Sequence, residues 1–259
     1  MRKLTDTAFP GEFIGAFRDA EKVCCFTGAG ISKESGLPTY RDLDDGMWRN
    51  YDPMTFATYE GFIDNTPLVW NNFISRYRQI AAAQPNEGHR ALGRMDAYYK
   101  DFYVCTQNVD DLHERGGLGR LGHIHGSAAN VRCIKCGRRF PVTEELLARE
   151  VTEDTIPRCS VCGNILRPDI VWFGETVPVD VLQKAADCAY SCDIFIIIGT
   201  SMEVSGGYGL LSYAKRGGAL TVDVNPRGSA VSGQCDYWLQ GSAGLFLPAI
   251  VRELEAGRA

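Results

Sequence analysis

The sequence lacks the features that mark several classes of protein. It has no run of about 18 apolar residues, which excludes a membrane-spanning helix, and its longest apolar stretch, Ile194–Ile198, is only as long as a strand. No apolar segment of the kind found in secretory signals follows the first residues. A basic excess is also absent, because the net charge is −5. We therefore expect a cytoplasmic protein that binds neither membranes nor, directly, nucleic acid.

The ten cysteines do not form the pattern of a disulfide framework. Four of them make two C-x-x-C pairs, Cys133 with Cys136 and Cys159 with Cys162, and the others are scattered in apolar surroundings. Four thiolates on two tight turns are typical of a closed tetrahedral zinc site, which has a structural role. A redox pair or a chance grouping of cysteines is the alternative.

Short apolar segments that end in glycine or small polar residues predict the fold class. We expect strands at residues 23–26, 102–105, 194–198 and 220–224. We expect helices at 12–22, 179–189, 207–215 and 245–254. This alternation is typical of an α/β fold, a Rossmann-like parallel sheet with helices on both faces. Ligands of such sheets bind beyond the carboxyl ends of the strands, where the polar clusters of this sequence follow.

Two segments interrupt the alternation and are predicted to be insertions into a single domain of residues 1–259. Residues 42–95 are rich in aromatic side chains and contain candidate helices at 53–63 and 67–83. Residues 128–166 hold the paired cysteines and are predicted to form the zinc module. The Rossmann-like core then comprises residues 1–41, 96–127 and 167–259.

A glycine-rich segment follows the first predicted strand. Gly28 and Gly30 would permit a tight turn and let backbone N–H groups approach a pyrophosphate. The dehydrogenase pattern has a third glycine three residues after the second, whereas here the next one is Gly36. The spacing disfavours hydride transfer but leaves a dinucleotide phosphate site open.

Polar residues near the ends of the second strand and the segment after it are candidates for chemistry. His125 precedes Gly126 and the zinc module, a suitable place for a general base, although a single histidine is more often a packing or surface residue. Gln107, Asn108 and Asp110 could bind ribose hydroxyls or a carboxamide, and loop capping is the alternative.

Taken together these segments resemble the sirtuin family, as a bacterial-type member with one domain. The matching strings are GAGISKESGLPTYRD (28–42), TQNVDDLHERGG (106–117), HIHGS (123–127), the two C-x-x-C pairs, RPDIVWFGE (167–175), GTSMEV (199–204), VDVNP (222–226) and QGSAG (240–244). They occur in the family's order over nearly the whole chain. The resemblance implies an NAD-dependent protein-lysine deacylase with one structural zinc ion.

The resemblance also implies a role for particular residues, with His125 and Asn108 as the catalytic pair. The NAD-binding set would be Gly28, Ala29, Gly30, Ser32, Glu34, Pro38, Thr39, Tyr40, Arg41, Gln107, Asn108, Val109, Asp110, His125, Gly199, Thr200, Ser201, Asn225, Pro226, Arg227 and Ala243. Tyr40 stands where many members have Phe. The segment Val171, Trp172, Phe173, Gly174 and Glu175 would pair with the backbone of the substrate as an added strand.

The implied reaction transfers an acyl group from lysine to ADP-ribose and releases nicotinamide, with His125 taking a proton from a ribose hydroxyl. Members that prefer acidic acyl chains carry a Tyr and an Arg three residues apart, and the corresponding positions here are Phe73 and Arg76. An acetyl or other short neutral chain is therefore expected. Acyl-lysine proteins or peptides would be the partners of a monomeric enzyme.

Two alternatives stay open from the sequence. A mono-ADP-ribosyltransferase on the same fold would attach ribose to a protein group and leave acyl-lysine untouched. An NAD sensor or zinc-ribbon interaction module would bind NAD without consuming it, and the intact set of His125, Asn108 and Asp110 argues against this reading.

Overall fold

The computed structural model describes residues 1–39, 52–203 and 207–257. Its largest element is a parallel sheet with the strand order β1-β10-β9-β8-β2-β3-β4. The strands are β1 (Arg2–Leu4), β2 (Lys22–Thr27), β3 (Asp101–Thr106), β4 (Leu121–His123), β8 (Ile194–Ile198), β9 (Leu220–Val224) and β10 (Tyr237–Leu239). The predicted Rossmann-like α/β fold is confirmed, and the four predicted strands form its centre.

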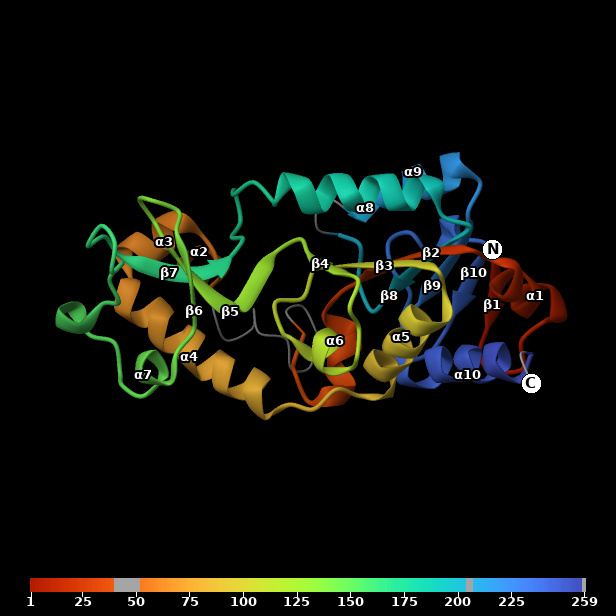
Figure 1. The fold of residues 1–259 in the computed structure, drawn as a ribbon, viewed down its shortest axis with the longest axis horizontal. Coiled ribbons are helices and arrows are strands. Elements are labelled where there is room, and N and C mark those ends of the chain that lie inside the picture. Colours follow the sequence, from red (N-terminus) through yellow and green to blue (C-terminus); the bar gives the residue numbers. More distant parts are fainter. Residues whose placement is uncertain (40–51, 204–206, 258–259) are drawn as a thin grey trace.

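Helices cover both faces of this sheet, as Figure 1 shows. One layer consists of α1 (Gly11–Asp19), α5 (Glu87–Tyr98) and α10 (Ala243–Ala256), and the other of α8 (Val179–Ser191) and α9 (Gly207–Gly217). Strand β8 contributes apolar side chains to the core on both faces of the sheet. Ile194, Ile196 and Ile198 pack with α10, and Phe195 and Ile197 pack with α8 and α9. Its side chains are all buried, which explains why the sequence is an unbroken apolar run.

A second region lies beyond one end of the sheet (Figure 1). It holds an antiparallel sheet in the order β6-β5-β7, made of β5 (Gly126–Cys133), β6 (Arg139–Pro141) and β7 (Leu166–Ile170). The helices around it are α2 (Pro53–Phe56), α3 (Tyr59–Asp64), α4 (Thr66–Ala82) and α7 (Glu144–Leu147). The short helix α6 (Leu112–Arg115) follows β3. No helix in the described ranges is both long and apolar enough to cross a membrane.

Two sequence-based expectations need correction. The helix predicted at 53–63 is two helices, because Thr58 ends one and begins the next: its hydroxyl donates to the Met54 carbonyl at 2.5 Å and accepts from the Gly61 N–H at 3.0 Å. Helix α5 was not predicted. Although residues 87–95 fall in the expected insertion 42–95, Ala91, Leu92 and Met95 of α5 are buried in the core of the large sheet.

Candidate active site

A cavity of about 720 Å³ lies beyond the carboxyl ends of β2, β3, β8 and β9. It extends from the large sheet to α4 and the segment after β7. The predicted residues that line it are Ala29, Gly30, Thr39, Phe73, Arg76, Gln107, Asn108, Val109, His125, Val171, Trp172, Phe173, Gly174, Glu175, Gly199, Thr200, Ser201, Asn225, Pro226 and Arg227. One cavity therefore brings together most of the residues expected for NAD, catalysis and substrate.

Six predicted residues do not line the cavity. They are Gly28, Ser32, Glu34, Pro38, Asp110 and Ala243. Glu34 instead caps α10, since its carboxylate accepts hydrogen bonds at 2.9 Å from the Ser242 hydroxyl and the Gly244 N–H. Two further predicted residues, Tyr40 and Arg41, and Val204 of the matched string 199–204 lie outside the described residues.

The glycine turns after β2 and β8 pack against each other without room for side chains. The Gly30 N–H donates to the Gly199 carbonyl at 2.7 Å, and a Cβ atom on Gly30 would lie 2.6 Å from that same oxygen. Gly199 has a φ of +59°, a conformation that favours glycine. This packing occurs where the strand order reverses, which is the ligand-binding crevice of open α/β sheets.

Asn108 is held by a buried chain of hydrogen bonds. The Ser32 hydroxyl donates to the Asp110 carboxylate at 3.1 Å, so it must accept the hydrogen bond from the Asn108 side-chain NH₂, also at 3.1 Å. This assignment fixes which way the amide is turned. Ser32 and Asp110 thus act from behind Asn108, and burial raises the pKa of the Asp110 carboxyl.

His125 has one ring nitrogen committed to the backbone. Its Nδ1 lies 3.1 Å from the Gln107 carbonyl oxygen, which can only accept, so Nδ1 carries the hydrogen. In the neutral ring Nε2 then keeps its lone pair. Burial lowers the pKa of His125, and the bond to Gln107 offsets this only in part. The geometry and the pKa both favour a neutral imidazole that can accept a proton.

The chain after His125 is locked against β7. Gly126 has a φ of +78°, and a Cβ atom there would lie 2.1 Å from the Asp169 carbonyl oxygen. The Val171 N–H donates to the His125 carbonyl at 2.9 Å. Only glycine permits this close approach, which joins His125 to the segment expected to bind substrate.

We call residues 171–175 the docking segment. The segment follows β7 and is bound to the residues between α2 and α3. The Phe173 N–H donates to the Ala57 carbonyl at 2.8 Å, and Phe173 forms a parallel β-bridge with Thr58. The Phe173 side chain is 45% exposed, whereas the Trp172 side chain is buried. The Glu175 carboxylate is bound by Arg132 and Arg167 of the small sheet.

Helix α4 supplies one wall of the cavity. Phe73 and Arg76 both line it, as do Tyr77 and Asn72, which the sequence reasoning did not name. The Arg76 guanidinium donates to the Pro38 carbonyl and to the Gln79 side chain, each at 3.0 Å. Tyr77 lies four residues after Phe73 and thus on the same helical face, a signal that could have identified it.

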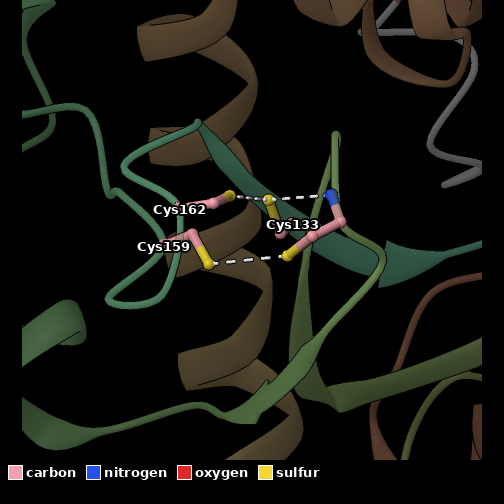
Figure 2. Close-up of side chains that lie close together, drawn as sticks. Cys133, Cys159 and Cys162 are labelled. Carbon is pink, nitrogen blue, oxygen red and sulfur yellow. Dashed lines mark hydrogen bonds between the residues drawn. The ribbon is translucent and has the colours of Figure 1, made fainter.

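The four predicted zinc ligands lie together at the tips of the small sheet (Figure 2). Their sulfur atoms are all within 4.8 Å of one another, with 3.4 Å between Cys133 and Cys162 and 3.8 Å between Cys136 and Cys159. Sulfurs placed 2.3 Å from a tetrahedral zinc ion lie about 3.8 Å apart. Both C-x-x-C turns are followed by a glycine of positive φ, Gly137 and Gly163. The residues present therefore fit a zinc ion.

The other six cysteines are free and buried. They are Cys24, Cys25, Cys105, Cys188, Cys192 and Cys235, and they pack within the two layers of the large sheet. The expectation of buried thiols in place of a disulfide framework is confirmed.

Comparison with known proteins gives a consistent result. The model of the Sir2 family matches residues 28–206. An NAD-dependent protein deacylase of Mycobacterium tuberculosis strain H37Rv is 38% identical over 91% of this chain and 98% of its own length. A protein of the same name from Aquifex aeolicus is 39% identical over 88% of this chain and 93% of its own length.

Two solved structures extend the comparison. A Sir2 homologue in complex with NAD is 33% identical and superimposes with a TM-score of 0.89 over 99% of this chain and 98% of its own. A Sir2 histidine variant with a deacetylated p53 peptide and 3′-O-acetyl ADP-ribose is 25% identical, with a TM-score of 0.84 over 93% of this chain and 97% of its own.

Proposed function

Because this chain belongs to the Sir2 family, we propose that it is an NAD-dependent protein-lysine deacylase. It transfers the acyl group of an acyl-lysine side chain to ADP-ribose, releases nicotinamide and frees the lysine amine. The observation that carries this proposal is the single cavity, in which a neutral His125 faces the same space as the glycine turns and the docking segment. A site that only stored NAD would not need a base at this position.

The cavity has the size and chemistry that NAD requires. Its volume of about 720 Å³ falls in the range of roughly 300–1,000 Å³ that is usual for ligand and cofactor sites. The glycine turns carry no side chains and therefore let the phosphates approach the backbone after β2 and β8 closely. The amide and hydroxyl side chains of Gln107, Thr200, Ser201 and Asn225 offer partners for the sugars and the carboxamide.

We assign the predicted NAD set to these tasks, including Tyr40 and Arg41 next to Thr39. Ser32 and Asp110 act through Asn108, which they hold. Gly28 serves by close packing, since a Cβ atom there would lie 2.7 Å from Thr200 Cβ. Glu34 acts indirectly, because it fixes the start of α10 and with it Ala243.

When bound, NAD supplies the ribose to which the acyl group is transferred. His125 is the general base and accepts at Nε2 the proton of a ribose hydroxyl. Asn108 orients the ribose with the side-chain oxygen that its bond to Ser32 leaves available. Phe73, Val109 and the Trp172 ring enclose the reacting atoms in apolar surface and thereby exclude competing water.

The docking segment binds the peptide backbone of the substrate as an added strand. The acyl-lysine side chain then enters the cavity beside α4, between Phe73 and Arg76. A zinc ion held by Cys133, Cys136, Cys159 and Cys162 would have no open position and would support the fold of the small sheet.

We further propose that the enzyme acts as a monomer in the cytoplasm and does not bind nucleic acid directly. The six buried free thiols suit a reducing compartment. The net charge of −5 disfavours the phosphate backbone. Light scattering coupled to size exclusion would measure the oligomeric state, and a dimer would contradict the proposal.

One experiment tests the function. The purified protein is incubated with NAD and an acetyl-lysine peptide, and all products are identified by mass spectrometry. A deacylase yields equal amounts of free-lysine peptide, nicotinamide and O-acetyl-ADP-ribose. A peptide or protein that gains ADP-ribose while the acetyl group stays would identify a mono-ADP-ribosyltransferase, and unconsumed NAD would indicate a sensor.

A further inference from the structure

Two arginines of the small sheet face each other across neighbouring strands. Arg132 of β5 is the direct antiparallel partner of Arg167 of β7, and the next pair in the register is Cys133 with Leu166. Like charges directly opposite one another destabilise a strand pair. The register therefore places an unfavourable pair of cations one residue from a predicted zinc ligand, and this pair requires a compensating anion.

Glu175 of the docking segment is the anion that both arginines share, and Asp169 lies 3.6 Å from Arg132 as a second one. Arg132 Nη2 lies 3.2 Å from both carboxylate oxygens, and Arg167 binds the same two oxygens with both of its Nη atoms, at 3.0 Å for Nη2 and Oε2. The carboxylate also accepts the Trp172 N–H at 2.9 Å. One side chain thus bridges both cations and closes the docking segment on itself.

Arg167 also binds the start of the docking segment, through Ile170 and Trp172. Its Nη2 donates to the Ile170 carbonyl at 2.7 Å, directly before the segment, and its Cζ lies 3.4 Å from the centroid of the Trp172 ring. That ring packs in turn on Phe62 of α3, with centroids 5.1 Å apart. Phe173 then lines the cavity with its side chain partly exposed.

Because these side chains are largely shielded from water, their contacts contribute to the stability of the docking segment. The side chain of Arg167 is 2% exposed and that of Glu175 20%, so water screens their interaction far less than it screens a surface pair. Removal of one partner from such a pair leaves a buried charge without compensation. The structure can lower the energy of this uncompensated charge most easily by a shift of the docking segment, which carries the anion and lies at the cavity wall.

We propose that Glu175 is a positioning residue through which the zinc-bearing sheet sets the affinity for the acyl-lysine peptide. Arg132 and Arg167 hold Glu175, and Glu175 holds residues 171–174 in the conformation to which a substrate strand adds. NAD binds to the turns of the large sheet and does not depend on this network. This inference rests on the proposed deacylase function.

The test compares steady-state kinetics of Glu175→Gln, Arg132→Gln and their double variant with those of the wild type. Glu175→Gln should raise the KM for an acetyl-lysine peptide about tenfold or more, because charged hydrogen bonds at a partly buried carboxylate are lost. The KM for NAD and the kcat at saturating peptide should change by less than about twofold, because the peptide binding that is lost contributes equally to the ground state and the transition state. Zinc content should stay at one ion per chain.

Glu145→Gln is the matched control, since it removes the same charge from an exposed ion pair with Arg149 within residues 128–166. It should leave both KM values unchanged. Arg132→Gln keeps the Arg167–Glu175 pair and should therefore fold even if Glu175→Gln does not. It should raise the peptide KM by a smaller factor and add nothing in the Glu175→Gln background.

Several outcomes would overturn the inference. An unchanged peptide KM in both single variants would show that the network does not position the docking segment. A parallel fall in kcat, zinc content and thermal midpoint would show general damage to the fold instead of a loss of peptide affinity. If the wild type itself does not deacetylate the peptide, the proposed function fails, and this result is distinct from either of the other two.

Discussion

The two sheets of this protein are stabilised in different ways. The centre of the large sheet is apolar: every residue of β8 is buried, and helices cover both faces of the sheet. In the small sheet, β6 has no buried residue and β5 alternates buried and accessible positions. Its additional support consists of the four cysteines and the ion pairs of Arg132, Arg139 and Arg167 with Asp169 and Glu175.

This difference has a functional consequence. Apolar burial gives the large sheet a stability that needs no ligand, so its turns are preformed for NAD. The small sheet shares a separate apolar core with α3 and α4, and a metal ion and charges that compensate one another would add to its order. The cavity lies between these regions, and only one of its walls therefore depends on zinc.

Loss of zinc should have the largest effect, and it should damage the small sheet while the large sheet survives. A Cys136→Ser variant should lose its single equivalent of metal and all measurable deacylation, because the docking segment loses its support. Trypsin should then cut within residues 128–166, where Arg138, Arg149 and Arg158 lie. The NAD-binding turns should survive, since the large sheet does not include the metal site.

Metal analysis, limited proteolysis and NAD titration of that variant would measure the three expectations together. Serine in place of Cys235, a buried free thiol far from the zinc set in sequence, is the matched control and should keep its metal. A metal-free protein that resists trypsin and remains active would contradict the account of the small sheet.

The second largest effect is expected at the junction of the two regions. His125→Ala should lower kcat by at least about 100-fold, which is the usual contribution of a general base. NAD affinity and thermal stability should remain close to those of the wild type, because the ring makes one hydrogen bond, to the Gln107 carbonyl. Single-turnover kinetics and calorimetric NAD titration would separate the two.

His123→Gln is a suitable comparison for this variant. His123 is bound to the Asn108 carbonyl and to Glu114, each at 2.8 Å, and does not line the cavity. Glutamine can keep one of these bonds, so the loss of activity should be well below that of His125→Ala. Near-normal deacylation by His125→Ala would show that another group is the base.

The sequence predicted the large sheet better than the small one, for a physical reason. Strands buried on both faces are continuous apolar runs, and the stripe of Leu247, Ile250, Val251 and Leu254 in α10 is equally clear. The edge strands β1 and β4, and β10 next to β1, have three residues each, too few to show any period. The start of α5 does carry a local signal, because the Asn86 side chain caps it by accepting from the N–H groups of Gly88 and His89.

The site shows the same division between local and long-range information. The four zinc ligands follow from spacing alone, because each C-x-x-C turn is a local structure. The cap that Glu34 forms on α10 joins residues about two hundred positions apart, so no local pattern could indicate it. The pairing of Arg132 with Arg167 likewise depends on strand register. Tyr40 and Arg41 are still predictions.

A smaller effect concerns the acyl chain, and it probes the wall of the cavity that α4 provides. Acetyl-lysine should be preferred over succinyl-lysine by about ten- to a hundredfold in kcat/KM, since Phe73 lacks a hydroxyl for the extra carboxylate. Arg76 does line the cavity, so Phe73→Tyr should reduce or reverse this preference. Matched peptides with the two acyl groups provide the measurement.

Tyr77 gives this prediction a control. Its ring packs near Phe73, with centroids 6.2 Å apart, and it also lines the cavity. If Tyr77 supplies the hydroxyl that Phe73 lacks, the wild type will prefer succinyl-lysine and Tyr77→Phe will abolish that preference. A succinyl preference that survives Tyr77→Phe would show that Arg76 suffices.

The smallest effect is the response of activity to pH. It bears on the comparison of the two sheets because acid protonates both His125 and the cysteine ligands of the small sheet. Burial lowers the pKa of His125 below its ordinary value of 6.5, so the ring is neutral at pH 7 and protonation removes the base only below pH 6.5. The peptide kcat/KM should therefore be level near pH 7 and fall below pH 6.5. It should fall tenfold per pH unit once the pH is below that pKa.

The other histidines do not interfere with this acid limb. Burial lowers the pKa of His89 to about 4 and that of His113 well below its ordinary value, so both stay neutral over the range. Burial opposes the charge on His123, but the Glu114 carboxylate, the Asn108 carbonyl and the charge of Asp110 together outweigh it and raise the pKa of His123 above its ordinary value of 6.5. Zinc content must be measured at each pH, because acid also protonates thiolates and releases the metal. With zinc retained, an acid limb with an apparent pKa above 6.5 would contradict a desolvated His125 as the base. A limb that follows the release of zinc would instead assign the loss of activity to the small sheet.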